Sequence, residues 1–304
     1  MTPVTSTDLK GNLPLIARGK VRDLYQVSGD SLLFVATDRI SAFDVIMENG
    51  VTDKGRILTK LSKFWFNLLS DITENHLITS SDAELFQKLP QEISGNPELK
   101  SQLEGRSLLV RKYKILPLEV IVRGYITGSA WKEYQKQGTV HGIKVPQGLK
   151  ECQELPTPIY TPSTKAEQGE HDENISPEQA ERIVGHELAA KIEKVALDLY
   201  KKAREYAKTR GIIIADTKFE FGVDGNNNLV LVDEVLTPDS SRFWNASTYE
   251  IGRDQDSYDK QFLRNWLISK KLKGVEGVSM PEDIVSKTKE KYVEAYEVLT
   301  GEKW

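Results

Sequence analysis

Residues 212–222 constrain the fold more than any other part of the chain. This run predicts a strand, and successive side chains of a strand point to opposite faces. Asp216, Lys218 and Glu220 therefore share one face, while the two phenylalanines that alternate with them lie on the other. Three charges on one face of an otherwise apolar strand are unusual. We expect this face to line a functional site.

A second strand is predicted at residues 229–232, after the turn-forming residues 224–228, so the two runs form a hairpin. Asp233 and Glu234 end the second strand, and carboxylates from both strands converge at one end. Mg²⁺ prefers oxygen ligands and is commonly held by one or two carboxylates plus nucleotide phosphates. The alternative is a solvated face with ordinary ion pairs. Like charges packed this closely usually mark a site that needs a counter-cation, so the hairpin predicts a Mg²⁺ site.

Composition restricts the class of protein. The chain has 304 residues, 39% of them hydrophobic, which suffices for a large core in one or two domains. No run approaches the roughly 18 apolar residues of a membrane span, and the first 20 residues lack a signal-peptide pattern, so we expect a cytoplasmic protein without a membrane partner. Cys152 is the only cysteine, and the four histidines show no metal-ligand spacing. The net charge of −4 argues against a nucleic-acid partner.

A short basic segment near the N-terminus is a candidate phosphate site. Neither the Walker-type motif G-x-x-x-x-G-K-[ST] nor the motif G-x-G-x-x-G occurs. Gly19 and Lys20 are followed by Val21, where the Walker-type motif requires serine or threonine. Arg18, Lys20 and Arg22 are nevertheless spaced for one face of a strand, and Gly19 permits close backbone approach. A hairpin of this kind, folded over a nucleotide, is able to hold its phosphates as the glycine-rich lids of kinases do. The alternative is an ordinary exposed strand.

A second anion site is predicted where a helix begins at residues 127–129. Ser129 is the expected N-cap, and free amides and the helix dipole at such an end favour a phosphate. Arg123, just upstream, adds a positive charge. Ser241 and Arg242, which follow the acidic hairpin, supply a hydroxyl and a guanidinium for an anionic substrate. A plain helix cap and a surface turn are the alternatives.

Two domains are predicted, a small strand-rich domain at residues 1–114 and a larger α/β domain at residues 115–304, with Pro117 interrupting the strands between them. The expected elements are a hairpin at residues 17–27 and 32–37, loops at 91–106 and 140–173, one helix at 176–210, and C-terminal helices at 256–273 and 281–299. The long second loop is either a functional flap or a solvated one.

A phosphate lid, a pair of metal-binding carboxylates and a second anion pocket together indicate phosphoryl transfer on a phosphorylated small molecule. Two alternatives remain at this point. One is a kinase or ligase that acts on another phosphorylated metabolite, and the other is a non-catalytic, ATP-binding regulatory module.

Two segments carry a resemblance to a known family. Residues 116–129 and 214–222 closely resemble the two signature segments of the SAICAR synthetase family of purine biosynthesis, and residues 18–22 and 233–242 are also similar to that family. The resemblance implies an ATP-dependent ligase that joins carboxyaminoimidazole ribonucleotide to L-aspartate through an acyl phosphate, giving SAICAR, ADP and phosphate. It also implies an α+β or α/β two-domain fold, in which a small antiparallel-sheet ATP-binding domain of the ATP-grasp and kinase kind packs on a larger α/β domain.

Position by position, the resemblance implies roles for individual residues. The ATP-binding residues are Arg18, Gly19, Lys20, Val21, Arg22, Val110 and Lys112. The ribonucleotide-binding residues are Arg123, Ser129, Asp216, Lys218, Ser241 and Arg242, of which Asp216, Lys218 and Arg242 are also catalytic. Mg²⁺ is assigned to Glu220 and Asp233, with Glu234 as the alternative to Asp233.

The aspartate site and the oligomeric state have less direct support. We place L-aspartate at Lys165, His171 and Asp172, because a charged flap over an acyl phosphate excludes water. The chain has a longer middle loop and extra C-terminal helices compared with shorter family members. These additions are placed to cover a surface that shorter members use for oligomerisation, so a monomer is expected.

Overall fold

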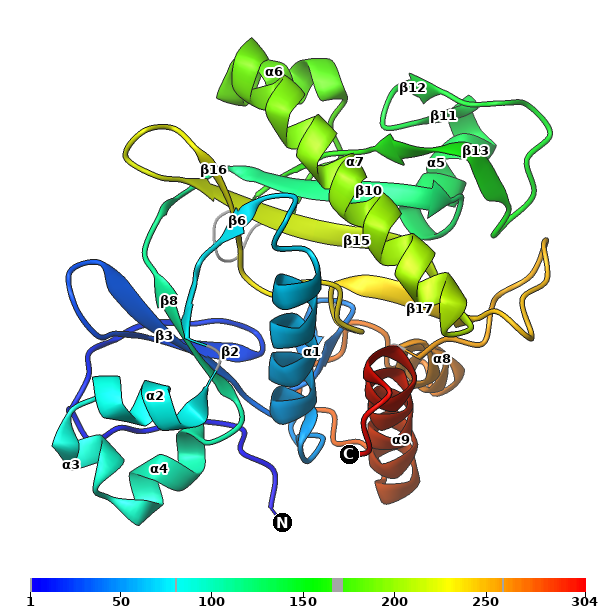
Figure 1. Ribbon diagram of the computed structural model, residues 1–304. Coiled ribbons are helices and arrows are strands. Elements are labelled where there is room, and N and C mark those ends of the chain that lie inside the picture. Colours follow the sequence, from blue (N-terminus) through cyan, green and yellow to red (C-terminus); the bar gives the residue numbers. More distant parts are fainter. Residues whose placement is uncertain (1, 80, 166–171, 259) are drawn as a thin grey trace. The chain divides into compact units, whose positions relative to one another are not determined.

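The computed structural model describes residues 2–79, 81–165, 172–258 and 260–304. The chain divides into two compact units (Figure 1). Unit 1 comprises Met1–Phe66, His76–Tyr113 and Asp259–Trp304, and unit 2 comprises Asn67–Asn75 and Lys114–Tyr258. Both units are mixed α/β structures built on largely antiparallel sheets. None of the described helices combines the length and the apolar character needed to cross a membrane.

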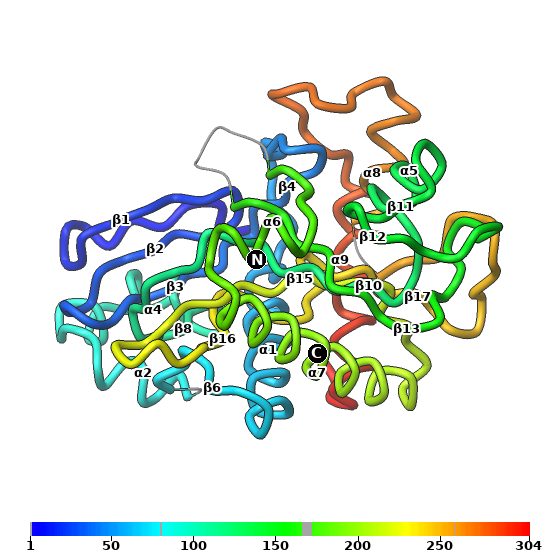
Figure 2. The backbone as a smooth tube through the Cα atoms, turned by 90° about the horizontal axis from the view of Figure 1, so that it is seen from above, coloured from blue at the N-terminus to red at the C-terminus, as the bar shows by residue number. Residues whose placement is uncertain are grey.

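The sheet of unit 1 is antiparallel, and its first strands lie side by side in Figure 2. Its order is β1 (Leu15–Arg18), β2 (Arg22–Gln26), β3 (Ser31–Ala36), β8 (Ser107–Arg111) and β7 (Leu77–Thr79). The predicted strand through residues 18–22 is wrong, because residues 19–21 form the turn between β1 and β2. The Gly19 amide donates to the Arg22 carbonyl at 2.8 Å and closes that turn.

Helices occupy the predicted loop at residues 91–106, which is a second correction. They are α3 (Gln91–Ser94) and α4 (Pro97–Leu103), and they follow α2 (Asp82–Lys88). The Asn96 side chain accepts hydrogen bonds from the amides of the first turn of α4, and Pro97 stands at N1. Leu99 and Leu103 are buried in the same apolar cluster as Leu33 of β3. The polar composition of the segment concealed these few buried residues.

The C-terminal helices α8 (Gln261–Ser269) and α9 (Glu282–Thr300) belong to unit 1, together with α1 (Lys54–Leu68), β4 (Ser41–Ala42) and β5 (Val45–Ile46). This differs from the expected domain at residues 115–304. Leu263, Leu267 and Ile284 pack in one buried cluster with Ile40 and Met47. Helical periodicity indicates that a helix has a buried face, but it does not identify the partner of that face.

The sheet of unit 2 has β15 (Ile212–Val223) near its centre, which confirms the strand predicted at residues 212–222. Phe219 and Phe221 are fully buried on one face. The order is β13 (Glu154–Tyr160), β10 (Leu118–Tyr125), β15, β16 (Leu229–Val232) and β6 (Glu74–Asn75), with β9 (Lys114–Ile115), β14 (Ser163–Thr164) and β17 (Ser241–Asn245) paired alongside. β15 and β16 form the predicted hairpin.

Three further predictions in unit 2 need correction. The expected loop at residues 140–173 contains β13 and β14, together with the small hairpin of β11 (Thr139–Val140) and β12 (Ile143–Lys144), because β13 and β14 pair with β10. The expected single helix divides at Gly185 into α6 (Pro177–Val184) and α7 (His186–Thr209), and α7 packs against β15 and β10 (Figure 1). The helix α5 (Gly128–Gln137) has Thr127 as its N-cap residue, two residues before the expected Ser129.

Candidate functional site

One acidic side chain joins two arginines across three strands of unit 2. Asp216 of β15 is directly opposite Arg123 of β10 and Arg242 of β17, and residues directly opposite one another share a face of the sheet. Arg123 Nη1 lies 3.1 Å from Asp216 Oδ2, and Arg242 Nη1 donates to the same oxygen. Asp216 is only 4% exposed. One carboxylate therefore fixes two guanidinium groups. Arg123, Asp216 and Arg242 together form an arginine row with a net positive charge.

The first residues of α5 lie against this row. Gly128 has a φ of +60°, and a Cβ built on it would stand 2.5 Å from Arg242 Nη2, so the guanidinium packs directly on the helix N-terminus. Arg123 Nη2 donates to Ser129 Oγ at 3.3 Å, and the N-cap Thr127 makes no side-chain capping hydrogen bond. Helix amides, a hydroxyl and two guanidinium groups converge here. Such a combination binds a phosphate.

A second cluster lies further along β15. Lys218 Nζ donates to Glu119 Oε1 at 2.6 Å and to Glu220 Oε1 at 3.1 Å, and Lys165 Nζ donates to the other oxygen of Glu220. Glu119 was not among the predicted site residues. A usable signal was present, because Glu119 and Arg123 are four residues apart on one strand and therefore share a face.

The charge states of this cluster follow from its surroundings. Burial alone lowers the pKa of Lys218, but Glu220 and Glu119 outweigh burial and raise the pKa above its ordinary value. Asp233 acts in the same direction. Burial raises the pKa of Glu119, and Lys218 opposes that rise. Lys218 therefore carries a positive charge at neutral pH.

The predicted metal ligands belong to the same cluster. Glu220 contacts two ammonium groups, and Asp233, directly after β16, lies close enough to raise the pKa of Lys218. Across the described ranges 2–79, 81–165, 172–258 and 260–304, no group of three or more His, Cys, Asp or Glu side chains is placed to hold a metal ion. Two carboxylates that now balance lysine cations nevertheless fit Mg²⁺, which takes its remaining ligands from phosphates and water.

The alternative metal ligand, Glu234, is engaged differently. Thr237 Oγ1 donates to Glu234 Oε2 at 2.5 Å within the turn that follows β16. Ser241 was expected at the ribonucleotide, but its hydroxyl pairs with Thr217 Oγ1 at 2.8 Å. Since Thr217 is adjacent to Asp216 along β15, this places the Ser241 hydroxyl on the opposite face from the arginine row. The structure does not bring Ser241 together with the other predicted residues.

The flap residues divide between described and undescribed parts of the chain. Lys165 reaches Glu220, and Asp172 acts electrostatically on Glu119. Both therefore approach the lysine and carboxylate cluster. His171 lies outside the described residues.

Unit 1 contains the predicted ATP-binding residues. Lys20 Nζ lies 2.6 Å from Asp44 Oδ1, and both side chains are more than half exposed. Arg18 Nε lies 3.2 Å from Asp23 Oδ1. Gly19, Val21 and Arg22 complete the turn. Val110 is fully buried within β8, so its side chain is not at the surface, and the exposed Lys112 donates its amide to the Asp30 carbonyl at 2.7 Å.

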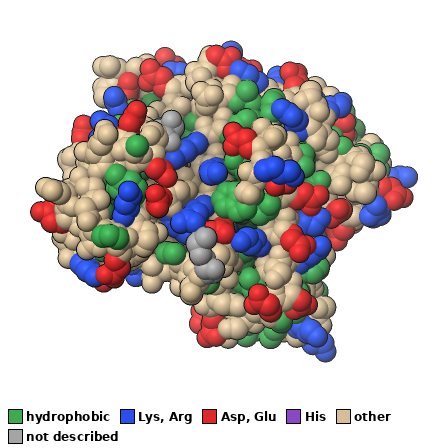
Figure 3. All heavy atoms as spheres, turned by 60° about the horizontal axis from the view of Figure 1, so that its bottom comes forward, with side chains coloured by type: hydrophobic (Ala, Val, Ile, Leu, Met, Phe, Trp, Pro, Cys, Tyr) green, Lys and Arg blue, Asp and Glu red, His purple; other side chains and the backbone are tan. Residues whose placement is uncertain are grey.

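Charged side chains of both signs lie on the surface. On the face shown in Figure 3, lysine and arginine side chains are interspersed with aspartate and glutamate.

Comparison with known proteins gives consistent results. The sequence model of the family described as SAICAR synthetase matches residues 15–281. A phosphoribosylaminoimidazole-succinocarboxamide synthase of Pichia angusta is 67% identical over 301 residues, covering 99% of both chains. A solved SAICAR synthase from Saccharomyces cerevisiae, complexed with SAICAR, has a TM-score of 0.93 and 62% identity and covers 99% of both chains. A SAICAR synthetase in complex with ADP has a TM-score of 0.69 and 28% identity, covering 95% of this chain and 98% of the other.

Proposed function

The chain belongs to the SAICAR synthetase family, and from that premise we propose how its residues carry out the family's reaction. It is an ATP-dependent ligase that condenses carboxyaminoimidazole ribonucleotide with L-aspartate in purine biosynthesis. Unit 1 is assigned as the ATP-binding domain, related to ATP-grasp enzymes and kinases, and unit 2 as the ribonucleotide-binding domain. The enzyme acts in the cytoplasm as a monomer.

The chemistry proceeds in two steps. A carboxylate is a poor electrophile until one of its oxygens becomes a leaving group. The ribonucleotide carboxylate attacks the γ-phosphorus of ATP, the bond to the ADP oxygen breaks, and an acyl phosphate forms. The amine of L-aspartate then attacks the acyl carbon, phosphate leaves with the bridging oxygen, and the amine loses a proton as the amide forms.

The arginine row carries the assignment of the ribonucleotide site. Arg123 and Arg242 are fixed by Asp216 beside the N-terminus of α5, and Ser129 adds a hydroxyl. A phosphomonoester placed there meets two guanidinium groups and the helix amides, which matches the 5′-phosphate of the ribonucleotide. Phosphate binding at this point leaves the imidazole carboxylate to extend along the same face of β15 toward Lys218.

Lys218 supplies a fixed positive charge where negative charge accumulates during phosphoryl transfer. Its raised pKa keeps it protonated beside the substrate carboxylate, so it attracts and orients that group without accepting a proton. Glu220 and Asp233 are the residues that would hold Mg²⁺, which when bound supplies charge neutralisation for the ATP phosphates. Lys165, His171 and Asp172 are assigned to L-aspartate, because Lys165 and Asp172 approach the same cluster.

A substrate-omission assay tests the reaction. Purified protein with Mg-ATP, carboxyaminoimidazole ribonucleotide and L-aspartate is expected to release ADP only when all three substrates are present. Release without L-aspartate would indicate a kinase that acts on the ribonucleotide. No release under any condition would favour the regulatory ATP-binding module.

The metal assignment predicts the behaviour of three variants. Glu220→Gln and Asp233→Asn each remove one carboxylate charge, and we expect turnover to fall by about 10²-fold or more together with a higher Mg²⁺ requirement. A titration of ADP release with Mg²⁺ measures both quantities. Glu234→Gln is the matched control, because it changes the neighbouring carboxylate that Thr237 engages. If Glu234→Gln raises the Mg²⁺ requirement and Asp233→Asn does not, Glu234 replaces Asp233 as the ligand.

A further inference from the structure

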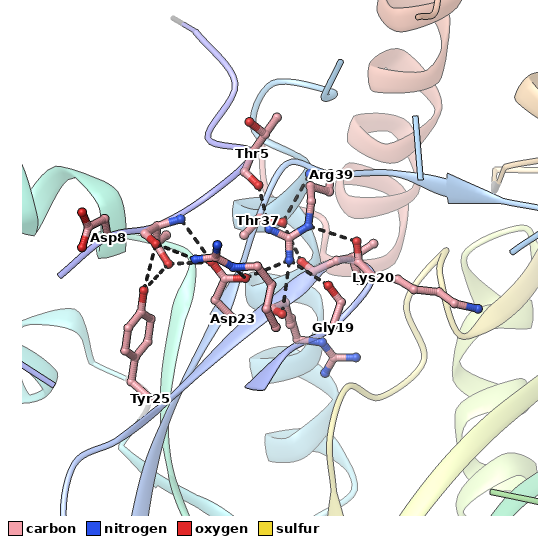
Figure 4. A network of polar contacts seen from close by, with 12 residues as sticks. Thr5, Asp8, Gly19, Lys20, Asp23, Tyr25, Thr37 and Arg39 are labelled. Carbon is pink, nitrogen blue, oxygen red and sulfur yellow. Dashed lines mark hydrogen bonds and ion pairs between the residues drawn. The ribbon is translucent and has the colours of Figure 1, made fainter. Parts of the chain in front are cut away.

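The guanidinium of Arg39 lies directly behind the turn between β1 and β2 (Figure 4). Arg39 is only 8% exposed. Its Nε donates to the Lys20 carbonyl at 3.1 Å, and its Nη2 donates to the carbonyls of Gly19 and Arg22 at 2.9 and 3.2 Å. Three of the four carbonyls of the turn are therefore directed at one buried cation.

Thr37 engages the fourth carbonyl. Its amide and its Oγ1 donate to the Val21 carbonyl at 2.9 and 2.8 Å. The four consecutive carbonyls of residues 19–22 are thus all satisfied, those of Gly19, Lys20 and Arg22 by Arg39 and that of Val21 by Thr37. Arg39 Nη1 also donates to the Thr5 carbonyl at 2.6 Å, which ties the N-terminal segment to the same guanidinium.

The orientation of these carbonyls fixes the orientation of the amides. The described chain contains no cis peptide bond, and in a planar trans peptide the carbonyl and the following N–H point in opposite directions. The amides of Lys20 and Val21 consequently point away from Arg39, and the amide of Arg22 points away from Thr37. Successive amides directed to one side form a concave anion-binding surface. The side chains of Lys20 and Arg22 provide cations in the same turn.

We propose that Arg39 is a positioning residue for ATP, which turns the carbonyls of residues 19–22 inward so that the turn presents amides to the phosphates. This inference rests on the proposed function, in which the turn binds the phosphates of ATP. Without the guanidinium, the carbonyls lose a buried partner and rotate toward the phosphate side, where their negative ends repel the nucleotide.

Asp23 explains how a cation is kept at this buried place. The Asp23 carboxylate is completely buried, and its Oδ1 accepts from Arg39 Nη2 at 2.9 Å and from Arg18 Nε. Its Oδ2 accepts from the amide and the hydroxyl of Thr7 at 3.1 and 2.7 Å. A buried charge is tolerated when it is paired and hydrogen-bonded, so Asp23 holds Arg39 in its ionised and oriented state.

Arginine is required by geometry as well as by charge. Its planar guanidinium carries five N–H donors, whereas a lysine ammonium has three donors at a single point. Arg39 serves four carbonyls and one carboxylate. A lysine at this position keeps the positive charge but is unable to reach all of these acceptors together.

Arg39→Lys in the full-length protein tests the proposal, with Arg106→Lys as the matched control. Arg106 is also buried in unit 1, but its guanidinium bonds Asp38 at 2.8 and 3.2 Å and the Ala36 carbonyl instead of residues 19–22. Calorimetry measures the dissociation constants of ADP and of adenosine. We expect Arg39→Lys to weaken ADP binding about tenfold or more and to leave adenosine binding unchanged. Arg106→Lys is expected to lower the Tm without changing either constant.

The outcomes separate a positioning role from a merely structural one. Equal weakening of ADP and adenosine, or the same loss of ADP affinity in Arg106→Lys, overturns the proposal. If Arg39→Lys does not fold, Thr37→Val removes one donor to the Val21 carbonyl at constant size, and we expect about fivefold weaker ADP binding with adenosine unchanged. Unchanged ADP binding in Thr37→Val then overturns the proposal.

Lys20→Ala distinguishes failure of this inference from failure of the proposed function. Weaker ADP binding in Lys20→Ala with normal binding in Arg39→Lys overturns only the positioning role. Normal ADP binding in both variants removes the turn from the ATP site altogether.

Discussion

Lys218→Met will lower kcat by about 10³-fold while the protein stays folded. Methionine has nearly the length of lysine but no charge, so it leaves the carboxylates of Glu119, Glu220 and Asp233 without the cation that they share. With the substrate placed beside Lys218 as proposed, these carboxylates then repel its carboxylate and the incoming phosphoryl group. Single-turnover ADP formation with all three substrates measures the loss, and circular dichroism checks the fold.

The same variant has a predicted pH signature. In the native protein, burial raises the pKa of Glu119 and Lys218 opposes the rise. Removal of Lys218 lets the pKa of Glu119 rise further, so a larger fraction of Glu119 is protonated at any given acidic pH. The acid limb of the kcat profile is therefore expected to move to higher pH. Lys202→Met is the control, because Lys202 pairs with Asp71 on the surface of unit 2. The assigned role would be contradicted if Lys218→Met had a kcat within tenfold of the native value and the acid limb of its pH profile did not move.

Gly128→Ala will raise the KM for carboxyaminoimidazole ribonucleotide by about 10²-fold and will change kcat less. The added Cβ would stand 2.5 Å from Arg242 Nη2, a distance that side chains do not tolerate. The Arg242 guanidinium must then shift from its place at the N-terminus of α5, which disturbs the proposed phosphate site. Initial rates as a function of ribonucleotide concentration, at saturating ATP and L-aspartate, provide the measurement.

Gly138→Ala separates this effect from backbone strain. Gly138 ends the same helix with a φ of +71°, and a Cβ at that residue meets nothing within 4 Å. Both variants place alanine in the left-handed region, at a cost of about 1 to 2 kcal/mol each. We expect Gly138→Ala to lower the Tm and to keep the KM for the ribonucleotide. Equal KM values in the two variants would mean that the position of Arg242 does not determine phosphate binding.

The alternation of charged and apolar residues predicted β15 and its hairpin, because this pattern depends only on residues that are consecutive in the sequence. Phe219 and Phe221 are buried, and Asp216 and Lys218 contact partners on the opposite face, as period two requires. The direction of the Ser241 side chain is outside the reach of local pattern. Its orientation is set by the register between β15 and β17, which pairs it with Thr217, and register is a property of two strands that are distant in sequence.

Arg39 and Glu119 were missed for different reasons. Glu119 was detectable, since it shares a face of β10 with Arg123. Arg39 had no signal, because its function depends on the carbonyl orientation of a turn about 20 residues earlier in the chain. The C-terminal helices were assigned to the wrong unit because apolar periodicity carries no information about which surface covers a helix.

The division of the chain between the two units has a consequence for its synthesis. Unit 1 begins in the first 66 residues, but α8 and α9, whose apolar side chains complete the cluster around Ile40 and Met47, are made only after all of unit 2. A ribosome therefore delivers all of unit 2 before unit 1 is able to close its core. Until then the early apolar residues stay accessible to chaperones and to aggregation. Nascent chains halted before α8 should be captured by chaperones far more than chains released after α9.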